Sequence, residues 1–593
     1  MSKFAQQAER GPQIFAAVAT AAFFSSGLVY LYQGRCTVTM QDHWVIYEVL
    51  LNHSWLEGAL LKLYHHSLFF PNLIRLADLR FFHGDQQLLF FAGMVLLFCT
   101  VILLLVPLWR DKTVGLTSKL AATLVLIVGN FWMGRARITT SGGFLCENSL
   151  AIDGAMLAVL WLPTTQTEWT RSLKAYLIVM TSGFVASFSI ANGMAVWPAL
   201  LLLGWSLRLR RRSLVVLLAG TLTATLVYML LPGIPKNPGF SETLSSLLAA
   251  GKGLRNLCML LGAPFLRAEV AWTSHYKVSN QLAATSLLSL SCGALGLVLA
   301  GLAATPKLIR RDLGQSLLEL SALGLVIFNL GAIAIIVVGR ATYFNSFPED
   351  VSATRYLFWS SLFWTGLLLV LIQRAEPKKW VRWPVYFLAL AVPLGVLPSH
   401  YEQALLYRHQ NFMAESGATS LINDVCDTQQ IKILFHDPEQ VYRVAPQLRE
   451  RRLDMFAEGL HEWIGLSETS LFAGRQKSES FRGECHVDRL VHCEGGTSAA
   501  RVTGWSLKQH HTIPKTLVIL DPTGVVRGVA RSWTTNKFIS RAFYLGRFSG
   551  RNFLGYIRDY NPKLQYAVRC VDDGMLSDEQ IVVDTPVNAL SMQ

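Results

Sequence analysis

Long apolar runs separated by short polar joints fill the first 400 residues of the chain. About eleven of these runs are predicted to cross a membrane, because a spanning helix needs about 20 apolar residues. They cover residues 12–32, 87–108, 116–133, 149–163, 173–190, 194–207, 213–232, 281–303, 316–338, 355–373 and 383–398. No such run follows residue 400, where apolar and charged positions alternate as in soluble proteins. The pattern therefore predicts a helical membrane domain over 1–400 and a separate domain over 401–593.

Basic side chains occur in every second joint between the apolar runs. They are Arg110, Lys112, Arg171, Lys174, Arg208, Arg210, Arg211, Arg212, Lys307, Arg310, Arg311, Arg374, Lys378, Lys379 and Arg382. Because short basic loops stay in the cytoplasm, this pattern predicts a cytoplasmic N-terminus and an exported C-terminus. The first run lacks a small-residue cleavage site and is interpreted as an anchor. The remaining joints face the exterior, where we expect the functional site because loops carry chemistry more often than scaffolds.

Composition agrees with a membrane protein, since 52% of residues are hydrophobic and only 16% are charged. Soluble domains carry roughly 25% charged residues. The net charge of +14 gathers in the basic joints, which argues against a nucleic-acid-binding protein. We detect no internal repeat, which disfavours a transporter built from two halves.

The first exterior joint, residues 33–86, combines apolar periodicity with acidic and aromatic residues. It predicts two amphipathic helices in the membrane interface. Asp42 follows the first span closely, beside Trp44 and Tyr47, so its carboxylate is a candidate general base toward a membrane-bound substrate. The alternative is that Asp42 caps the following helix. His65 and His66 are either ligands or packing histidines. A second interfacial element is expected within 233–280.

The exported domain is predicted to be mixed α/β over 411–480 and a β-sandwich over 481–593. The predicted elements are a strand at Ile431–Phe435, a helix at Pro438–Glu450, a hairpin with strands 516–520 and 525–529, and a strand at 567–571 that opens another hairpin. Trp505, Trp533, Tyr544 and Tyr556 are candidates for sugar stacking or for core packing. Cys426, Cys485, Cys493 and Cys570 permit three disulfide connectivities, and we favour a bridge at Cys485 or Cys493.

Several short motifs occur in a fixed order on the predicted exterior side. They are Tyr64–Pro71, Glu147–Asn148, Ser189–Gly193 with Trp197–Pro198, and Thr354–Tyr356. With the interfacial first loop and the early acidic residue, they resemble bacterial members of the GT-C superfamily of membrane glycosyltransferases. That resemblance implies that Asp42 deprotonates the acceptor hydroxyl and that Glu147 is the second carboxylate, if one takes part. It leaves open whether a divalent metal ion is used, because His43 stands where some relatives have a second acid.

Transfer from a polyprenyl phosphate leaves a lipid phosphate, which requires fixed cations near the bilayer. Arginine suits phosphate oxygens, and Arg355 at the start of a span ranks first, followed by Arg340 and Arg267. Each of these arginines has the alternative role of anchoring a span. The full set of candidate binding residues is His43, His65, His66, Arg137, Asn192, Arg267, Arg340, Arg355 and Tyr356.

The sequence thus predicts a polytopic α-helical membrane protein of the bacterial inner membrane, with its C-terminal domain in the periplasm. Its expected activity is inverting transfer of a sugar from a polyprenyl-phosphate donor to a periplasmic acceptor. The acceptor is a glycan such as O-antigen, a pilin or other protein, or lipid A. The alternatives are a transporter or flippase of a lipid-linked glycan and a non-catalytic glycan-assembly protein.

Overall fold

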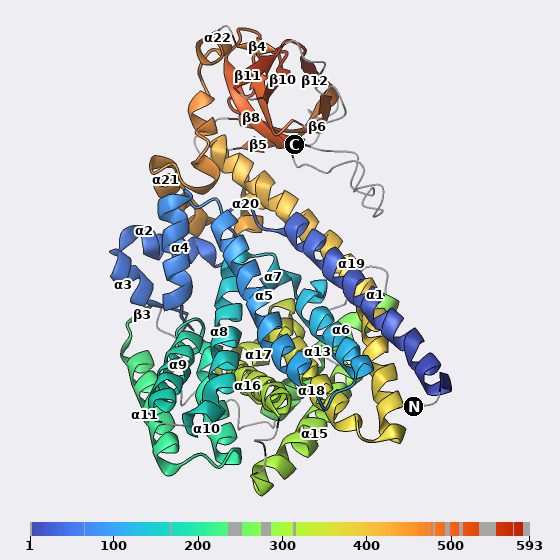
Figure 1. Cartoon of the computed structure of the whole chain (residues 1–593). Coiled ribbons are helices and arrows are strands. Elements are labelled where there is room, and N and C mark those ends of the chain that lie inside the picture. The colour runs from blue at the N-terminus through green and yellow to red at the C-terminus, as the bar shows by residue number, and fades with distance from the viewer. Residues whose placement is uncertain are drawn as a thin grey trace. The chain divides into compact units, whose positions relative to one another are not determined.

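The computed structural model divides into two compact units, which we describe separately (Figure 1). It describes residues 3–64, 66–166, 169–234, 252–273, 286–311, 313, 316–473, 475–477, 481–492, 498–508, 514–532, 553–572 and 574–584. The helical unit comprises Met1–Arg35, His53–Leu76 and Leu88–Tyr407. The C-terminal unit comprises Cys36–Asn52, Ala77–Gln87 and Arg408–Gln593, so it includes two segments of the first exterior joint.

Long apolar helices form the helical unit. They are α1 (Lys3–Gly34), α5 (Gln87–Arg110), α6 (Leu116–Phe131), α8 (Gly142–Trp161), α9 (Trp169–Ser187), α10 (Val196–Ser206), α11 (Arg211–Leu230), α13 (Lys252–Thr273), α15 (Leu287–Arg310), α16 (Leu317–Gly339) and α18 (Leu357–Ala375). Within the described ranges, nine helices are long and apolar enough to cross a membrane. Two predicted spans, 173–190 and 194–207, correspond to the shorter helices α9 and α10. The chain therefore has the helices of a multi-pass membrane protein, and the number of crossings stays a prediction.

Short elements connect these helices. They are α3 (Trp55–Leu60), η1 (Met133–Arg135), α7 (Ala136–Thr139), η2 (Leu162–Gln166), η3 (Ala191–Ala195), α17 (Ala341–Ser346), η5 (Pro348–Ser352) and η6 (Thr354–Tyr356). A three-stranded sheet of β1 (Lys62–Leu63), β2 (His66–Ser67) and β3 (Gly233–Ile234) has the order β2-β1-β3. Helices α4 (Phe69–Phe81) and α19 (Lys379–Ile422) contribute to both units. The predicted domain boundary at residue 400 lies inside α19.

One apolar core holds the helical unit together, with α16 against α18, α8 against α9 and α1 against α6. The backbones of α13 and α15 approach each other closely. A Cβ atom at Gly293 would lie 1.7 Å from the carbonyl oxygen of Cys258, so only glycine permits this crossing. The predicted spans therefore form one packed bundle.

The predicted cytoplasmic joints contact one another within the helical unit. Arg208 donates to the carbonyl of Arg310 at 2.9 Å, and Lys307 pairs with Glu319 at 3.3 Å. Arg374 pairs with the same Glu319 carboxylate at 2.8 Å. Three of the five basic joints, at 208–212, 307–311 and 374–382, are thus in contact at one end of the bundle, which agrees with the alternation of basic joints along the sequence.

Short helices precede the strands in the C-terminal unit. They are α2 (His43–Asn52), α20 (Thr428–Leu434), α21 (Pro438–Glu450), η7 (Asp454–Phe456), η8 (Leu460–Trp463) and α22 (Glu468–Leu471). The predicted helix at Pro438–Glu450 is confirmed, with Asp437 capping its first turn. The predicted strand at Ile431–Phe435 is wrong. Asp427 caps α20 there, and Ile431 and Leu434 are buried at helical spacing.

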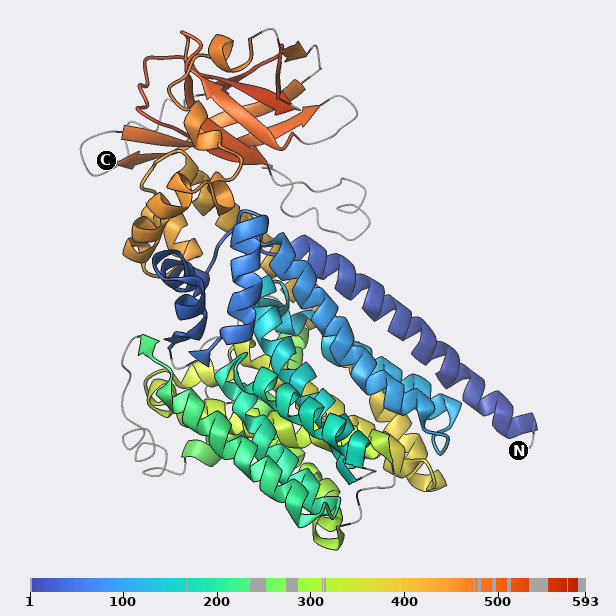
Figure 2. The same cartoon turned by 60° about the vertical axis from the view of Figure 1, so that its left-hand side comes forward.

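In the described part of the C-terminal unit nine strands follow: β4 (Gln476–Lys477), β5 (Phe481–His492), β6 (Ser498–Lys508), β7 (Thr516–Leu520), β8 (Val526–Ser532), β9 (Phe553–Ile557), β10 (Ala567–Asp572), β11 (Met575–Ser577) and β12 (Ile581–Asp584). The predicted hairpins are confirmed as β7–β8 and β10–β11. The predicted β-sandwich is wrong, because β12 pairs with both β5 and β10 and closes the ring β12-β5-β6-β9-β8-β7-β10. Figure 2 shows the strands of the C-terminal unit in orange and red. Closure leaves a barrel with one apolar interior.

Cysteine chemistry in the barrel differs from the prediction. Cys485 is a buried free thiol in the barrel core, so the bridge favoured at this residue is not formed. Burial raises the pKa of this thiol, which keeps it protonated and unreactive. Cys493, Trp533 and Tyr544 lie outside the described residues.

Candidate functional site

Three of the predicted phosphate-binding arginines gather around one segment of the helical unit, residues 343–356. We call Arg267, Arg340, Tyr343, Arg355 and Tyr356 the arginine–tyrosine cluster. The guanidinium carbon of Arg340 lies 5.8 Å from the ring centre of Tyr343 and 6.0 Å from that of Tyr356. The guanidinium of Arg355 lies 5.5 Å and 5.0 Å from the same two rings. Both guanidinium groups therefore lie near the same two tyrosine rings, as in cation–π interactions.

Local structure explains how these side chains meet. Helix α16 ends at Gly339. Arg340 follows at its C-terminus and directly precedes α17, the helix that contains Tyr343. The 3₁₀ turn η6 places Arg355 and Tyr356 directly before α18. Arg267 reaches the segment from α13, where its Nη2 donates to the carbonyl of Ser352 at 3.2 Å.

The arginines of the cluster differ in how their charge is balanced. Arg355 forms an ion pair with Asp350 at 2.9 Å and donates to the Tyr343 phenol at 3.3 Å. In the part of the chain that the structure describes, neither Arg340 nor Arg267 pairs with a carboxylate. A partly buried guanidinium without a counter-ion is costly, so the cluster suits an anionic ligand.

Arg137 and Asn192 lie in two short elements, one of which contacts η6 and the other α16. Arg137 is half-buried in α7, and α7 contacts η6. Asn192 is buried in η3, which packs against α16. Arg137 thus lies in an element that contacts the turn carrying Arg355, whereas Asn192 lies in one that contacts the helix ending before Arg340.

Glu147 is buried in α8 and forms an ion pair with Arg75 of α4, whose side chain is also buried. Arg75 Nη1 additionally donates to Asn72 at 2.9 Å. This pair belongs to the helical unit and fixes α4 against α8. The sequence prediction of a catalytic carboxylate at Glu147 did not anticipate this partner.

The predicted interfacial segment is attached to the end of α11. Lys62 donates its Nζ to the carbonyl of Tyr228 at 2.9 Å, and Tyr228 receives the Ser67 amide at 3.1 Å. His66 lies half-buried in β2 of the same small sheet. His65 lies outside the described residues, as do 235–251 and 274–280 of the second interfacial element expected within 233–280. The described part of that expected element contains helix α13, which packs against α15 and α18.

Asp42 belongs to the C-terminal unit and is exposed immediately before α2. Its backbone carbonyl accepts from the amides of Val45 and Ile46, both at 3.1 Å. Asp42 thus stands at the N-terminus of α2, and no ion pair of its carboxylate is found among the described residues. His43 is buried beside it. The carboxylate is therefore accessible, while its neighbour belongs to the core.

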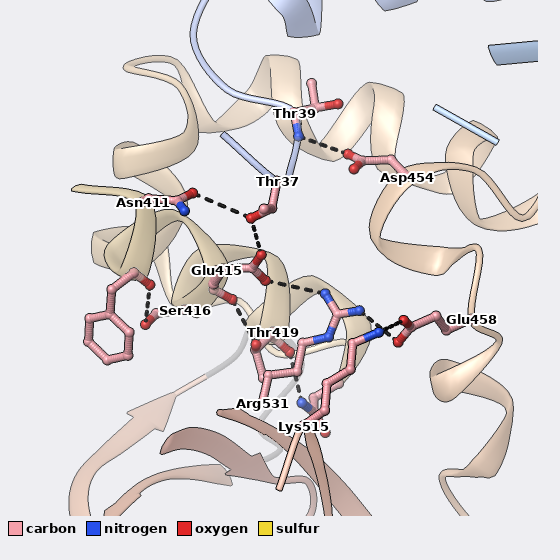
Figure 3. A network of polar contacts seen from close by, with 12 residues as sticks. Thr37, Thr39, Asn411, Glu415, Ser416, Thr419, Asp454, Glu458, Lys515 and Arg531 are labelled. Atoms are coloured by element: carbon pink, nitrogen blue, oxygen red, sulfur yellow. Dashed lines mark hydrogen bonds and ion pairs between the residues drawn. The ribbon is translucent and has the colours of Figure 1, made fainter. Parts of the chain in front are cut away.

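A polar network holds the segment that precedes Asp42 (Figure 3). The Thr39 amide donates to Asp454 at 3.0 Å, and the Thr37 hydroxyl donates to Glu415. Figure 3 shows Arg531 of β8 between Glu415 and Glu458, at 3.3 Å and 3.0 Å. Burial raises the pKa of the Asp454 carboxyl to about 7. Sequence reasoning missed these residues because they lie far apart in the chain and match no motif.

No group of three or more His, Cys, Asp or Glu side chains that could hold a metal ion occurs among the described residues. Of the aromatic residues considered for sugar stacking, Tyr556 has a structural role. Tyr556 is buried in β9 and donates to Asp427 at 3.0 Å, so it belongs to the core.

Comparison with known proteins gives one structural similarity that we report. No family model and no curated protein matches the chain. The chain is similar to the archaeal oligosaccharyltransferase AglB from Archaeoglobus fulgidus, solved with an inhibitory peptide and a dolichol-phosphate. The match has 13% identity and a TM-score of 0.36, and covers 73% of this chain and 60% of that one. The chain therefore spans less than two thirds of that protein.

At this TM-score the two structures differ too much for residues to be transferred. Assignments of catalytic and binding residues accordingly rest on this chain alone.

Proposed function

We propose that the chain is a membrane glycosyltransferase that moves a sugar from a polyprenyl-phosphate donor to a periplasmic glycan, protein or lipid acceptor. The observation that carries the proposal is the arginine–tyrosine cluster. It combines Arg340 and Arg267, which have no carboxylate partner in the described ranges, with aromatic faces in a membrane-type bundle. Such cations suit the phosphate of a lipid-linked donor.

In the proposed reaction, Asp42 takes the proton of the acceptor hydroxyl as that oxygen attacks the anomeric carbon. The bond from this carbon to the phosphate oxygen breaks, and the configuration inverts. The lipid phosphate leaves with the bonding electrons, and the arginines stabilise its new charge. Arg355 already pairs with Asp350, so Arg340 is the first candidate for the phosphate and Arg355 the second.

The test uses the full chain in proteoliposomes, with a panel of polyprenyl-phosphate hexoses and pentoses and an envelope extract as acceptor source. Release of polyprenyl phosphate measures transfer. Asp42→Asn should lower the rate by roughly 100-fold or more, because it removes the general base. The exposed Asp424 serves as the matched control, and Asp424→Asn should retain the rate.

Full turnover by Asp42→Asn would remove the base assignment. Movement of the intact donor across the bilayer without release of polyprenyl phosphate would favour the flippase alternative. Absence of both activities across the panel would favour a non-catalytic assembly protein.

A further inference from the structure

Every second residue of the segment before Asp42 is bonded to a different element of the C-terminal unit. Thr37 bonds to Glu415 of α19, Thr39 to Asp454 of η7, and the Gln41 amide to the Leu434 carbonyl of α20 at 2.6 Å. Alternation of this kind is typical of an extended chain whose one side faces the protein. The segment is therefore held along its whole length up to the residue before Asp42.

The backbone is strained at the last of these attachment points. Gln41 has a φ of 55°, in the left-handed region that favours glycine. This conformation is unfavourable for a residue with a side chain, because the Cβ atom comes close to the carbonyl oxygen. It persists where surrounding contacts determine it. The bond from Gln41 to Leu434 is such a contact, and it fixes the direction in which the chain enters Asp42 and α2.

Arg531 connects this attachment to the barrel. It lies on β8, is only 15% exposed, and pairs with Glu415 and Glu458. Lys515 pairs with the same Glu458 carboxylate. Removing Arg531 would leave Glu415 facing the buried Asp454 carboxyl without the cation that balances them. The barrel thus stabilises the very groups that hold Thr37 and Thr39.

We infer that Asp454, Glu415 and Arg531 are positioning residues. Through them the C-terminal unit holds the Asp42 carboxylate in the orientation that it needs to accept the proton. This inference rests on the proposed function. Under this inference the barrel contributes to catalysis by positioning the general base, in addition to any role in acceptor binding. A displacement of the base by about 1 Å is enough to slow a reaction by roughly 100-fold.

The experiment uses the full chain in proteoliposomes and measures two quantities. The first is kcat and KM for the polyprenyl-phosphate donor panel, and the second is amide hydrogen exchange of residues 37–42. Asp454→Ala removes the acceptor of the Thr39 amide, whereas Asp454→Asn retains an oxygen there. Arg531→Gln removes the cation that Glu415 and Glu458 share. Thr37→Val removes one hydroxyl at nearly constant volume and covers the case in which Arg531→Gln does not fold.

Arg527 provides the matched control, because it lies on the same strand and pairs with Asp521 at 2.8 Å. The amide hydrogens of residues 37–42 should exchange roughly tenfold faster or more in the variants Asp454→Ala, Arg531→Gln and Thr37→Val. Their kcat should fall at least roughly tenfold, with KM for the donor little changed. Asp454→Asn should restore both quantities, and Arg527→Gln should leave both at the native level.

Faster exchange with unchanged kcat would overturn the inference, as would an equal loss of kcat in Arg527→Gln. Native exchange in all variants would overturn it as well. These results differ from failure of the proposed function, which is signalled by full activity of Asp42→Asn.

Discussion

At the scale of single residues, Glu147 shows how a carboxylate acquires two competing interpretations. Its position near the exterior end of a span suggests chemistry, whereas its buried pairing with Arg75 suggests a structural role. Breaking a buried ion pair costs about 3–5 kcal/mol, because the remaining charge is left without a partner. The two roles therefore predict different behaviour when the carboxylate is removed.

We expect Glu147→Gln to lower the thermal midpoint of the detergent-solubilised chain, because it leaves the Arg75 guanidinium buried and unbalanced. The double variant Arg75→Met with Glu147→Leu should recover most of that loss, since it removes both charges together. Differential scanning fluorimetry measures both. A native midpoint combined with lost sugar transfer would instead support the catalytic role predicted from the sequence.

The cluster arginines allow a second residue-scale prediction. Arg340→Gln should raise KM for the polyprenyl-phosphate donor by roughly tenfold, the effect of losing one charged hydrogen bond to phosphate. Arg355→Ala should also weaken donor use, and Arg210→Gln, an exposed residue in a basic joint, should not. Donor titration of initial rates measures this. An unchanged KM in both cluster variants would indicate that these arginines only anchor their helices.

At the scale of elements, the sequence predicted segments with clear end signals better than short apolar runs. Asp437 and Pro438 mark the start of α21, and the helix forms there. The run Ile431–Phe435 looks equally suited to a strand or a buried helix turn, and five residues are too few to show a period. The Asp427 cap and the neighbouring core selected the helix.

The strands also show which features the local sequence predicts and which depend on distant parts of the chain. Alternation predicted β7, β8 and β10 and their hairpins, because each depends on its own residues and a tight turn. Whether such strands form two packed sheets or one closed sheet depends on the pairing of distant strands. The contacts of β12 with β5 and with β10 decide for the barrel.

At the scale of the whole molecule, the alternation of basic joints makes a prediction about topology. The joint residue Lys112 should face the cytoplasm and Asn345 the exterior, because positive loops are retained inside. Both side chains are exposed. In a chain with its nine native cysteines replaced, Lys112→Cys should resist a membrane-impermeant maleimide in intact cells. Asn345→Cys should react, and permeabilised cells should label both.

Labelling of Lys112→Cys in intact cells would reverse the orientation and place the arginine–tyrosine cluster on the cytoplasmic side. The proposed periplasmic acceptor would then be excluded. The grouping of basic joints at one end of the bundle would still stand, because it depends on contacts such as Lys307 with Glu319.

The sequence by itself was enough to predict the apolar helices, a side for each joint and the candidate cations, because hydrophobic length and loop charge are local properties. The apolar helices form, and the side of each joint stays a prediction. Only the tertiary structure decided which residues meet. It gathered Arg267, Arg340 and Arg355 around the segment 343–356 and paired Glu147 with Arg75. It also joined the segment before Asp42 to groups several hundred residues away. Such contacts depend on packing between distant segments, for which a single sequence carries no local signal.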